Sequence, residues 1–336
     1  MPVLVTGATG LLGSHLVDLL LERGESVRAL VRPGEAVDQL VHAGVDIRWG
    51  DLSDRASLQA AVAGVDRVLH CAARTGPWGP RSEYEITNIR GLETLINAAL
   101  DAGVRRFVHV SSITVLGNDM RGAADEASPL RVEPNPYSWS KVMGERLLDQ
   151  AMRERQVPVT IVRPGWIYGP RDTASFARFA AMIQRGRMIL IGSGNNRVPL
   201  IYVRDVAEGI VLASEAAGAV GRVYLLVNDE PVTQRDYLNA IAAELSVRPP
   251  SLRIPYRLAL TLGIAAETLG HLTRMQQPPP LTRYGLQLLG GENRFAIGRA
   301  RAELGFSPQI NLAEGVRRSV TWYRTLYCPN GKETLQ

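Results

Sequence analysis

Residues 3–15 read VLVTGATGLLGSH, a short apolar run that passes through closely spaced glycines into a second apolar segment. The first run has the length of a buried strand, and the residues after the glycines have the spacing of an amphipathic helix. Strand-like and helix-like segments continue to alternate up to about residue 169. Because repeated β–α–β units form parallel sheets covered by helices, the sequence predicts an α/β fold with a Rossmann-type doubly wound parallel sheet.

Beyond residue 169 the alternation becomes looser. A helix that begins at Asp205, with Glu208 completing a capping box, is expected between two strand-like runs, PLIYV and VYLLV. From residue 233 onward helices and a proline-rich link, QQPPPL, predominate, so a smaller, mostly helical C-terminal substrate domain is expected. The Rossmann domain is predicted to comprise 1–169 and 199–228, and the discontinuous substrate-binding domain to comprise 170–198 and 229–330.

The composition excludes several classes of protein. Of the 336 residues 46% are hydrophobic and 21% are charged, which is typical of a globular chain and excludes a disordered one. The net charge is +5, but basic and acidic residues are interspersed, so no nucleic-acid partner is expected. Cys71, Cys328 and the five histidines show no disulfide framework or metal-ligand spacing, so we expect no metal and a reducing compartment. With no signal-peptide pattern and no long apolar span, a cytoplasmic location is expected.

The glycines of the first stretch predict a dinucleotide site. Gly7, Gly10 and Gly13 follow a strand and open a helix with the spacing G-x-x-G-x-x-G, which lets the backbone approach a pyrophosphate at the helix N-terminus. The second strand ends at Arg32, and no acidic residue occurs before Glu35. An arginine there would pair with the 2′-phosphate of NADP, whereas an acid would bind the ribose hydroxyl of NAD, so NADP(H) is favoured over NAD(H).

A second group of residues predicts the chemistry. Tyr137 and Lys141, in YSWSK, lie four residues apart on one face of an expected helix. Ser112 ends the preceding strand, at the sheet edge where ligands of open α/β sheets bind. A tyrosine donates a proton to a ketone efficiently only if its pKa falls from about 10 toward neutrality, and the charge of Lys141 would lower it. Ser112 would hydrogen-bond the substrate oxygen, so these three residues predict a catalytic group for hydride transfer.

The segments TGATGLLG, GDL, HCAA, VSSITV, YSWSK and RPGWIYGP, in this order, resemble the extended short-chain dehydrogenase/reductase superfamily, the NAD-dependent epimerases and dehydratases. The resemblance covers nearly the whole chain and implies a triad of Ser112, Tyr137 and Lys141. It also implies that Asn88 helps hold the active site, with simple packing as the alternative. The cofactor contacts expected are Gly7, Thr9, Gly10, Leu11, Leu12, Gly13, Arg32, Asp51, Leu52, Ala72, Ala73, Tyr137, Lys141 and Pro164.

Within the superfamily, the stretch HCAARTGPWGPRSEYEITNIRG, SSITV and the C-terminal tail are similar to the 3β-hydroxysteroid dehydrogenase branch. This resemblance implies a hydrophobic secondary alcohol or ketone, either a sterol-like 3β-hydroxyl or a long-chain β-oxo acid. Expected substrate contacts are Arg74, Trp78, Tyr84, Trp139, Trp166 and Arg171. One alternative is a nucleotide-sugar 4-epimerase or reductase, although Arg197 lies one residue out of the register expected for gripping a diphosphate. The other is a non-catalytic NAD(P)-binding protein, which the Tyr137–Lys141 pair disfavours.

The tail contains an apolar helical stripe at Leu258, Leu262, Ala265, Leu269 and Leu272. Because further apolar residues occupy the opposite side, we expect this helix to need cover on both sides. Burial within the small domain or against a second subunit is one solution. A lipid-like ligand or a peripheral membrane contact through 256–275 is another, and a homodimer is the expected oligomer.

Overall fold

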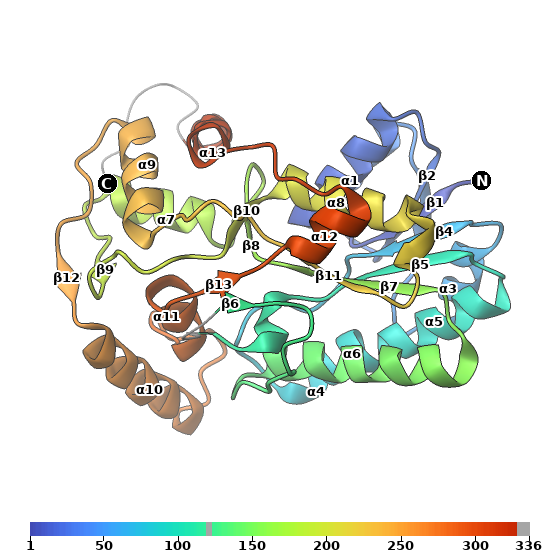
Figure 1. The fold of residues 1–336 in the computed structure, drawn as a ribbon, viewed down its shortest axis with the longest axis horizontal. Coiled ribbons are helices and arrows are strands. Elements are labelled where there is room, and N and C mark those ends of the chain that lie inside the picture. Colours follow the sequence, from blue (N-terminus) through green and yellow to red (C-terminus); the bar gives the residue numbers. More distant parts are fainter. Residues whose placement is uncertain (119–122, 328–336) are drawn as a thin grey trace.

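The structure is a computed structural model that describes residues 1–118 and 123–327. Cys328 and the end of the predicted substrate domain lie outside the described residues. A seven-stranded parallel sheet, in the order β11-β7-β5-β4-β1-β2-β3, forms its centre (Figure 1). The strands are β1 Val3–Thr6, β2 Val27–Val31, β3 Asp46–Trp49, β4 Arg67–His70, β5 Arg106–Val110, β7 Val159–Pro164 and β11 Val223–Leu226. The predicted fold class is confirmed, and the strand order reverses between β1 and β4, where such sheets open a crevice.

Helices cover both faces of the sheet, which explains why most of its strands are buried along most of their length. One buried cluster joins the sheet to α1 Leu11–Glu22, α2 Asp38–His42, α8 Val203–Glu215 and α12 Gly298–Leu304. A second joins the other face to α3 Arg55–Val62, α5 Gly91–Asp101 and α6 Pro136–Arg155.

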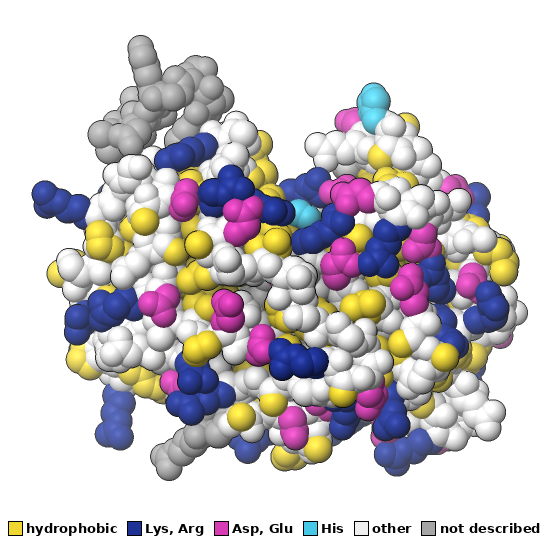
Figure 2. Space-filling view, turned by 45° about the horizontal axis from the view of Figure 1, so that its top comes forward, with side chains coloured by type: hydrophobic (Ala, Val, Ile, Leu, Met, Phe, Trp, Pro, Cys, Tyr) yellow, Lys and Arg dark blue, Asp and Glu magenta, His cyan; other side chains and the backbone are white. Residues whose placement is uncertain are grey.

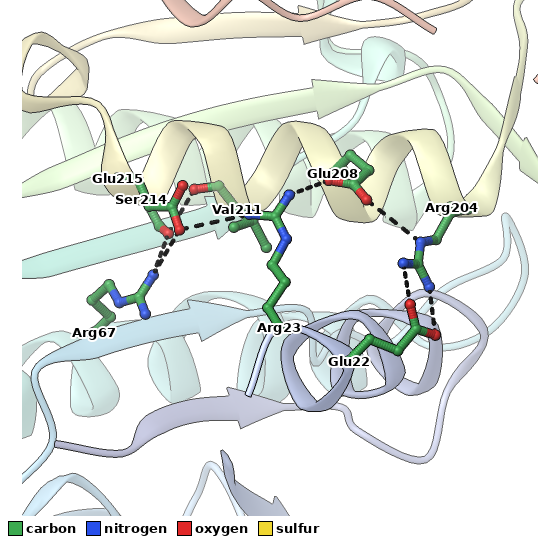
Figure 3. Close-up of polar contacts among 8 residues, drawn as sticks. All are labelled: Glu22, Arg23, Arg67, Arg204, Glu208, Val211, Ser214 and Glu215. Carbon is green, nitrogen blue, oxygen red and sulfur yellow. Dashed lines mark hydrogen bonds and ion pairs between the residues drawn. The ribbon is translucent and has the colours of Figure 1, made fainter. Parts of the chain in front are cut away.

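Ion pairs link α1 to α8 (Figure 3). Arg204 contacts Glu22 at 2.5 Å and Glu208 at 3.6 Å, and Arg23 also pairs with Glu208. These side chains are partly exposed, so each pair contributes at most about 1 kcal/mol. Apolar packing between the two helices therefore contributes more to their association than the ion pairs do.

The capping box predicted at Asp205 is wrong. Helix α8 begins at Val203, and the Asp205 carboxylate is buried in its first turn. It accepts hydrogen bonds from the backbone N–H groups of Gln309 (3.0 Å) and Ile310 (3.2 Å). A distant loop, rather than the start of its own helix, therefore satisfies this acid.

A third buried cluster forms the C-terminal lobe. Its helices are α7 Phe176–Gln184, α9 Gln234–Leu245, α10 Tyr256–Leu272, α11 Arg283–Gly290 and α13 Leu312–Tyr327. Short parallel pairs join β8 Trp166–Tyr168 to β10 Leu200–Tyr202, β9 Leu190–Ile191 to β12 Arg253–Ile254, and β6 Ala123–Ala124 to β13 Arg294–Phe295. Helix α12, which the sequence places in the C-terminal domain, packs against β11 and α8 of the sheet layer. The domain boundaries stay a prediction.

Helix α10 exposes its leucines and buries its small residues, although a stripe of leucines usually forms the buried side of a helix. Ala259, Gly263, Glu267 and Gly270 form its buried side, whereas the leucines of the predicted stripe are exposed. Small residues allow a close approach: a Cβ at Gly263 would stand 2.6 Å from Leu286 of α11. The described part of the chain therefore leaves the leucine stripe uncovered.

Two further observations concern the charges on the surface and the length of the helices. On the face seen in Figure 2, acidic and basic side chains are interspersed and form no field of one sign. Within residues 1–118 and 123–327, no helix is long and apolar enough to span a bilayer.

Candidate active site

A cavity of about 820 Å³ opens at the carboxyl ends of β1, β4, β5 and β7. It is lined by every residue predicted to be catalytic and every residue predicted to contact the cofactor. These residues come from strand ends and the turns that follow them, which parallel strands bring to one edge of the sheet. Their assigned roles stay predictions, but their placement at one site is an observation.

The glycine turn forms one end of the cavity. Gly7 has φ +71°, and a Cβ there would stand 2.8 Å from the Ala72 nitrogen. A Cβ at Gly13 would stand 2.0 Å from the Gly7 oxygen, so neither position accepts a side chain without rearrangement. Gly10, at the N-cap of α1, leaves the first N–H groups of that helix without a side-chain partner. This turn fits the pyrophosphate of a dinucleotide.

Arg32 and Glu35 lie beside that turn, at the cavity wall. The Arg32 Nε donates to the Glu35 carboxylate at 2.7 Å, and the Thr9 hydroxyl donates to the same carboxylate at 2.5 Å. Arg32 is 70% exposed, so its pair with Glu35 is readily broken. The sequence noted Glu35 only as the first acid after the strand; the structure places its carboxylate between Thr9 and Arg32.

Ser112, Tyr137 and Lys141 meet at the other end. Ser112 is the N-cap of a 3-10 turn and accepts from the Thr114 N–H at 3.2 Å, which fixes its hydroxyl. Helix α6 begins at Pro136 with the Asn135 side chain as its cap, which places Tyr137 in the first turn. The Lys141 Nζ donates to the Val110 oxygen at 2.8 Å and lies 5.9 Å from the centre of the Tyr137 ring.

Burial dominates the electrostatics of this group. Burial raises the pKa of Tyr137 above its ordinary value, and the adjacent Ser112 hydroxyl only partly opposes this. The predicted lowering of the Tyr137 pKa is therefore absent in the protein alone. Burial also lowers the pKa of Lys141 to about 8, against the opposing effects of Cys71 and Glu145. Cys71 lines the cavity, and burial raises the pKa of its thiol to about 12, which keeps it protonated.

A buried ion pair lies behind the catalytic group. Glu145, one turn after Lys141, accepts from Arg163 of β7 at 2.6 and 2.9 Å and from the Ser111 hydroxyl at 2.5 Å. The His70 and His109 rings lie in contact at a tilt of 31°, with centroids 5.4 Å apart, and burial lowers the pKa of His70 to about 3. Both imidazoles are therefore neutral, and Glu145 is the carboxylate that balances Arg163.

Asn88 holds the cavity wall. It lies in a π-helical segment, Glu85–Arg90, between α4 Arg81–Tyr84 and α5. Its side-chain nitrogen donates to the Arg74 oxygen (3.0 Å) and the Ser140 hydroxyl (2.8 Å), and its oxygen accepts from the Arg74 nitrogen (2.7 Å). Asn88 thus ties the loop after β4 to α6 one turn from Tyr137, which is a holding role and more than simple packing.

Three of the six expected substrate contacts, Arg74, Trp166 and Arg171, line the cavity. Trp78, Tyr84 and Trp139 are not among the residues that line it, and contact of all six with a substrate stays a prediction. The Tyr84 hydroxyl is turned inward and donates to the Gly76 oxygen at 2.7 Å. Trp78 stacks on His271 of α10 at 4.3 Å. Trp139 faces the groove between α5 and α6, where the Arg81 guanidinium lies 3.6 Å from its ring.

Sequence analysis missed Tyr284 and Leu288, which α11 contributes to the cavity. The Tyr284 ring meets the Tyr137 ring edge-on, with centroids 6.3 Å apart. Glu267 of α10 accepts from both the backbone nitrogen (2.7 Å) and the Nε (2.6 Å) of Arg283, and so fixes the start of α11. No local motif marks Tyr284, because only packing of the C-terminal lobe brings it to the site.

Comparison with known proteins identifies the family. The model of the NAD dependent epimerase/dehydratase family matches residues 3–226, which contain the glycine turn and the Ser112–Tyr137–Lys141 group. The chain belongs to this family. Structural similarity agrees: the dTDP-glucose 4,6-dehydratase of Streptomyces venezuelae, crystallised with NAD, superposes with a TM-score of 0.78 at 27% identity, covering 98% of this chain and 99% of that one.

Curated relatives indicate the branch of the family to which this chain is most similar. A 2-alkyl-3-oxoalkanoate reductase of Stenotrophomonas maltophilia is 33% identical over 326 residues, covering 95% of this chain and 98% of the reductase. The decarboxylating sterol-4-alpha-carboxylate 3-dehydrogenase of Mus musculus is 28% identical over 340 residues, covering 96% of this chain and 91% of the mouse protein. The resemblance to the 3β-hydroxysteroid dehydrogenase-like branch is confirmed, and this family member is an NAD(P)-dependent dehydrogenase or reductase.

Proposed function

We propose that this enzyme interconverts a hydrophobic ketone and its secondary alcohol, with Tyr137 as the proton donor and acceptor. The observation that carries the proposal is the single cavity in which Ser112, Tyr137 and Lys141 lie at one end and the glycine turn at the other. A dinucleotide held at the glycine turn would extend along this cavity toward the catalytic group. When bound, its reduced nicotinamide supplies the hydride for the carbonyl carbon.

The protein's own side chains transfer the proton and stabilise the negative charge that develops during the reaction. Tyr137 donates its hydroxyl proton to the carbonyl oxygen as the alcohol forms, and the Ser112 hydroxyl hydrogen-bonds that oxygen while charge develops on it. The phenolate left on Tyr137 is stabilised by the Lys141 ammonium, whose own charge Glu145 supports. In the direction of alcohol oxidation, the same groups act in reverse.

The wall of the cavity supports a hydrophobic substrate. Trp166, Tyr284 and Leu288 present apolar surface beside the catalytic group. Of the two arginines nearby, Arg74 pairs with Glu83 and Arg171 pairs with Asp18 at 2.8 Å, and both pairs are partly exposed. A nucleotide-sugar substrate would need basic side chains for its diphosphate, and Arg197, the other candidate for that contact, does not line the cavity. A sterol-like ketone or a long-chain β-oxo acid, whose apolar part matches the wall, fits better.

Tyr137→Phe gives the most direct test. Cofactor oxidation would be measured against 3-oxosteroids, long-chain β-oxo acids and UDP-sugars, with cofactor binding followed separately by fluorescence. We expect turnover of a lipid-like ketone in the native enzyme and a loss of about 10²–10⁴-fold in Tyr137→Phe, because general acid catalysis contributes that much. Cofactor affinity should change little. Undiminished turnover in Tyr137→Phe would remove the catalytic assignment, and conversion of a sugar nucleotide without net cofactor consumption would favour an epimerase.

We further propose that NADPH is preferred over NADH and that Arg32 contacts its 2′-phosphate. Glu35 opposes this preference, because it neutralises Arg32 and would repel the phosphate. Glu35→Gln should therefore raise the ratio of kcat/KM for NADPH to that for NADH, and Arg32→Asp should lower it by about tenfold or more. If neither variant shifts this ratio, the 2′-phosphate is recognised elsewhere.

A further inference from the structure

Helix α10 exposes more large apolar side chains than any other helix that the structure describes. Four leucines along the helix are exposed: Leu258 by 51%, Leu262 by 45%, Leu269 by 61% and Leu272 by 77%. We call these four leucines the α10 surface. Figure 1 shows α10 at the edge of the molecule, away from the seven-stranded sheet.

The polar groups on this side of the helix are satisfied within the helix itself. The Thr261 hydroxyl donates to the Arg257 oxygen at 3.0 Å, and the Thr268 hydroxyl donates to the Ile264 oxygen at 2.8 Å. Threonines bonded in this way need no water and tolerate an apolar medium. The exposed side of α10 is therefore suited to contact with hydrocarbon as well as with solvent.

In the segment of sequence around α10, the exposed charged residues are all basic. Between residues 249 and 291 the sequence contains a single acidic residue, Glu267, which is buried and paired with Arg283. Arg253 and Arg257 lie near the start of α10, and Arg274 lies just beyond its end. All three arginines are exposed. Exposed leucines with basic residues at both ends are typical of helices that lie in the interface of an anionic bilayer.

We propose that the α10 surface docks the enzyme on an anionic lipid surface. A second copy of the chain is a poorer occupant, because a two-fold interface would place this surface against itself and bring the arginines together without a carboxylate of the same segment to pair with them. Lipid phosphates supply the missing charge. The inference rests on the proposed function in one respect: the buried side of α10 fixes the start of α11, whose Tyr284 ring meets Tyr137, so the helix that carries the docked face also supports the substrate end of the cavity.

Vesicle flotation with the full-length enzyme tests this proposal, and it needs neither substrate nor cofactor. Vesicles of phosphatidylcholine alone would be compared with vesicles that also contain phosphatidylglycerol, at low and high salt. We expect binding to be about tenfold stronger on the anionic vesicles and to fall as salt screens the arginines. The double variant Leu262→Ser/Leu269→Ser should lose the binding. Val41→Ser, which changes an equally exposed apolar residue on α2, should keep it.

Failure of either expected result overturns the proposal. Native enzyme that does not float with anionic vesicles would contradict it, as would undiminished flotation of the double variant. A double variant that converts a dimer to a monomer in light scattering, with no vesicle binding by the native enzyme, would identify the α10 surface as a subunit interface instead. Circular dichroism and thermal unfolding show that each variant is folded. An enzyme that floats but reduces no ketone would defeat the proposed function and leave this inference intact.

Discussion

Helices α6 and α10 are both long, but the side that each buries differs in composition. Helix α6 buries Ser140, Lys141 and Glu145, each of which has a partner in the interior. Helix α10 buries glycine, alanine and one paired glutamate, and exposes its leucines. The difference shows that the buried side of a helix depends on the polar partners and the space that the neighbouring elements provide. The hydrophobicity of the sequence is only one of the factors that determine it.

Removal of a buried charge from α6 should give the largest effect. Glu145→Ala leaves Arg163 buried without a counter-charge, because both side chains are almost fully inaccessible. We expect a loss of about 3–5 kcal/mol in the free energy of unfolding, measured by denaturant titration. Glu154→Ala, at an exposed position of the same helix, is the matched control and should change stability by less than about 0.5 kcal/mol. Equal effects of the two substitutions would show that the Glu145–Arg163 pair is not buried in solution.

Substitution of the buried Gly263 should lower the stability of the protein more than substitution of its neighbour Leu262, although leucine is the more hydrophobic residue. Gly263→Val places a side chain against Leu286, and overpacking of this kind costs about 1–3 kcal/mol. Leu262→Ser alters the exposed side and should change stability by about 0.5 kcal/mol or less. Thermal or denaturant unfolding of both variants measures the difference. A larger loss for Leu262→Ser would mean that the leucine stripe is covered after all.

The pH dependence of ketone reduction should report the buried lysine of α6. The pKa of Lys141 is lowered to about 8, so its ammonium is present below that pH and is lost above it. Because the ammonium stabilises the Tyr137 phenolate, kcat/KM should fall by up to about tenfold for each pH unit above 8. Steady-state profiles of the native enzyme and Lys141→Met measure this: the variant should be slower and should lack the inflection. A native profile that stays flat to about pH 10 would refute the assignment of this role.

Local patterns were enough to predict the sheet and a set of residues that line one cavity at its edge. Gly7, Ser112 and Tyr137 each lie at or just after the end of a strand or at the start of a helix, and the parallel topology brings such positions together. The predictions were incomplete where contacts between segments far apart in the sequence determine where a side chain lies. Tyr284 reaches the cavity through the C-terminal lobe, and Trp139 is turned away by its place on α6.

Charge environments were predicted less well than positions. The sequence indicated that Lys141 would lower the pKa of Tyr137, but burial raises it and lowers that of Lys141 as well. Desolvation depends on the depth of each group below the surface, which spacing along the chain does not reveal. The same limit explains Asp205, whose partners are the backbone of a loop far away in the sequence.

The π-helical segment Glu85–Arg90 makes the active site sensitive to the number of residues as well as to their identity. A π turn accommodates one residue more than an α turn, so the segment behaves as a single-residue insertion in an otherwise α-helical stretch. Deleting one residue there would let the helix close into regular α geometry, and would rotate the two flanking parts relative to each other by about 100°. Asn88 would then lose its contacts with Arg74 and Ser140, although every side chain of the catalytic group remained in the chain.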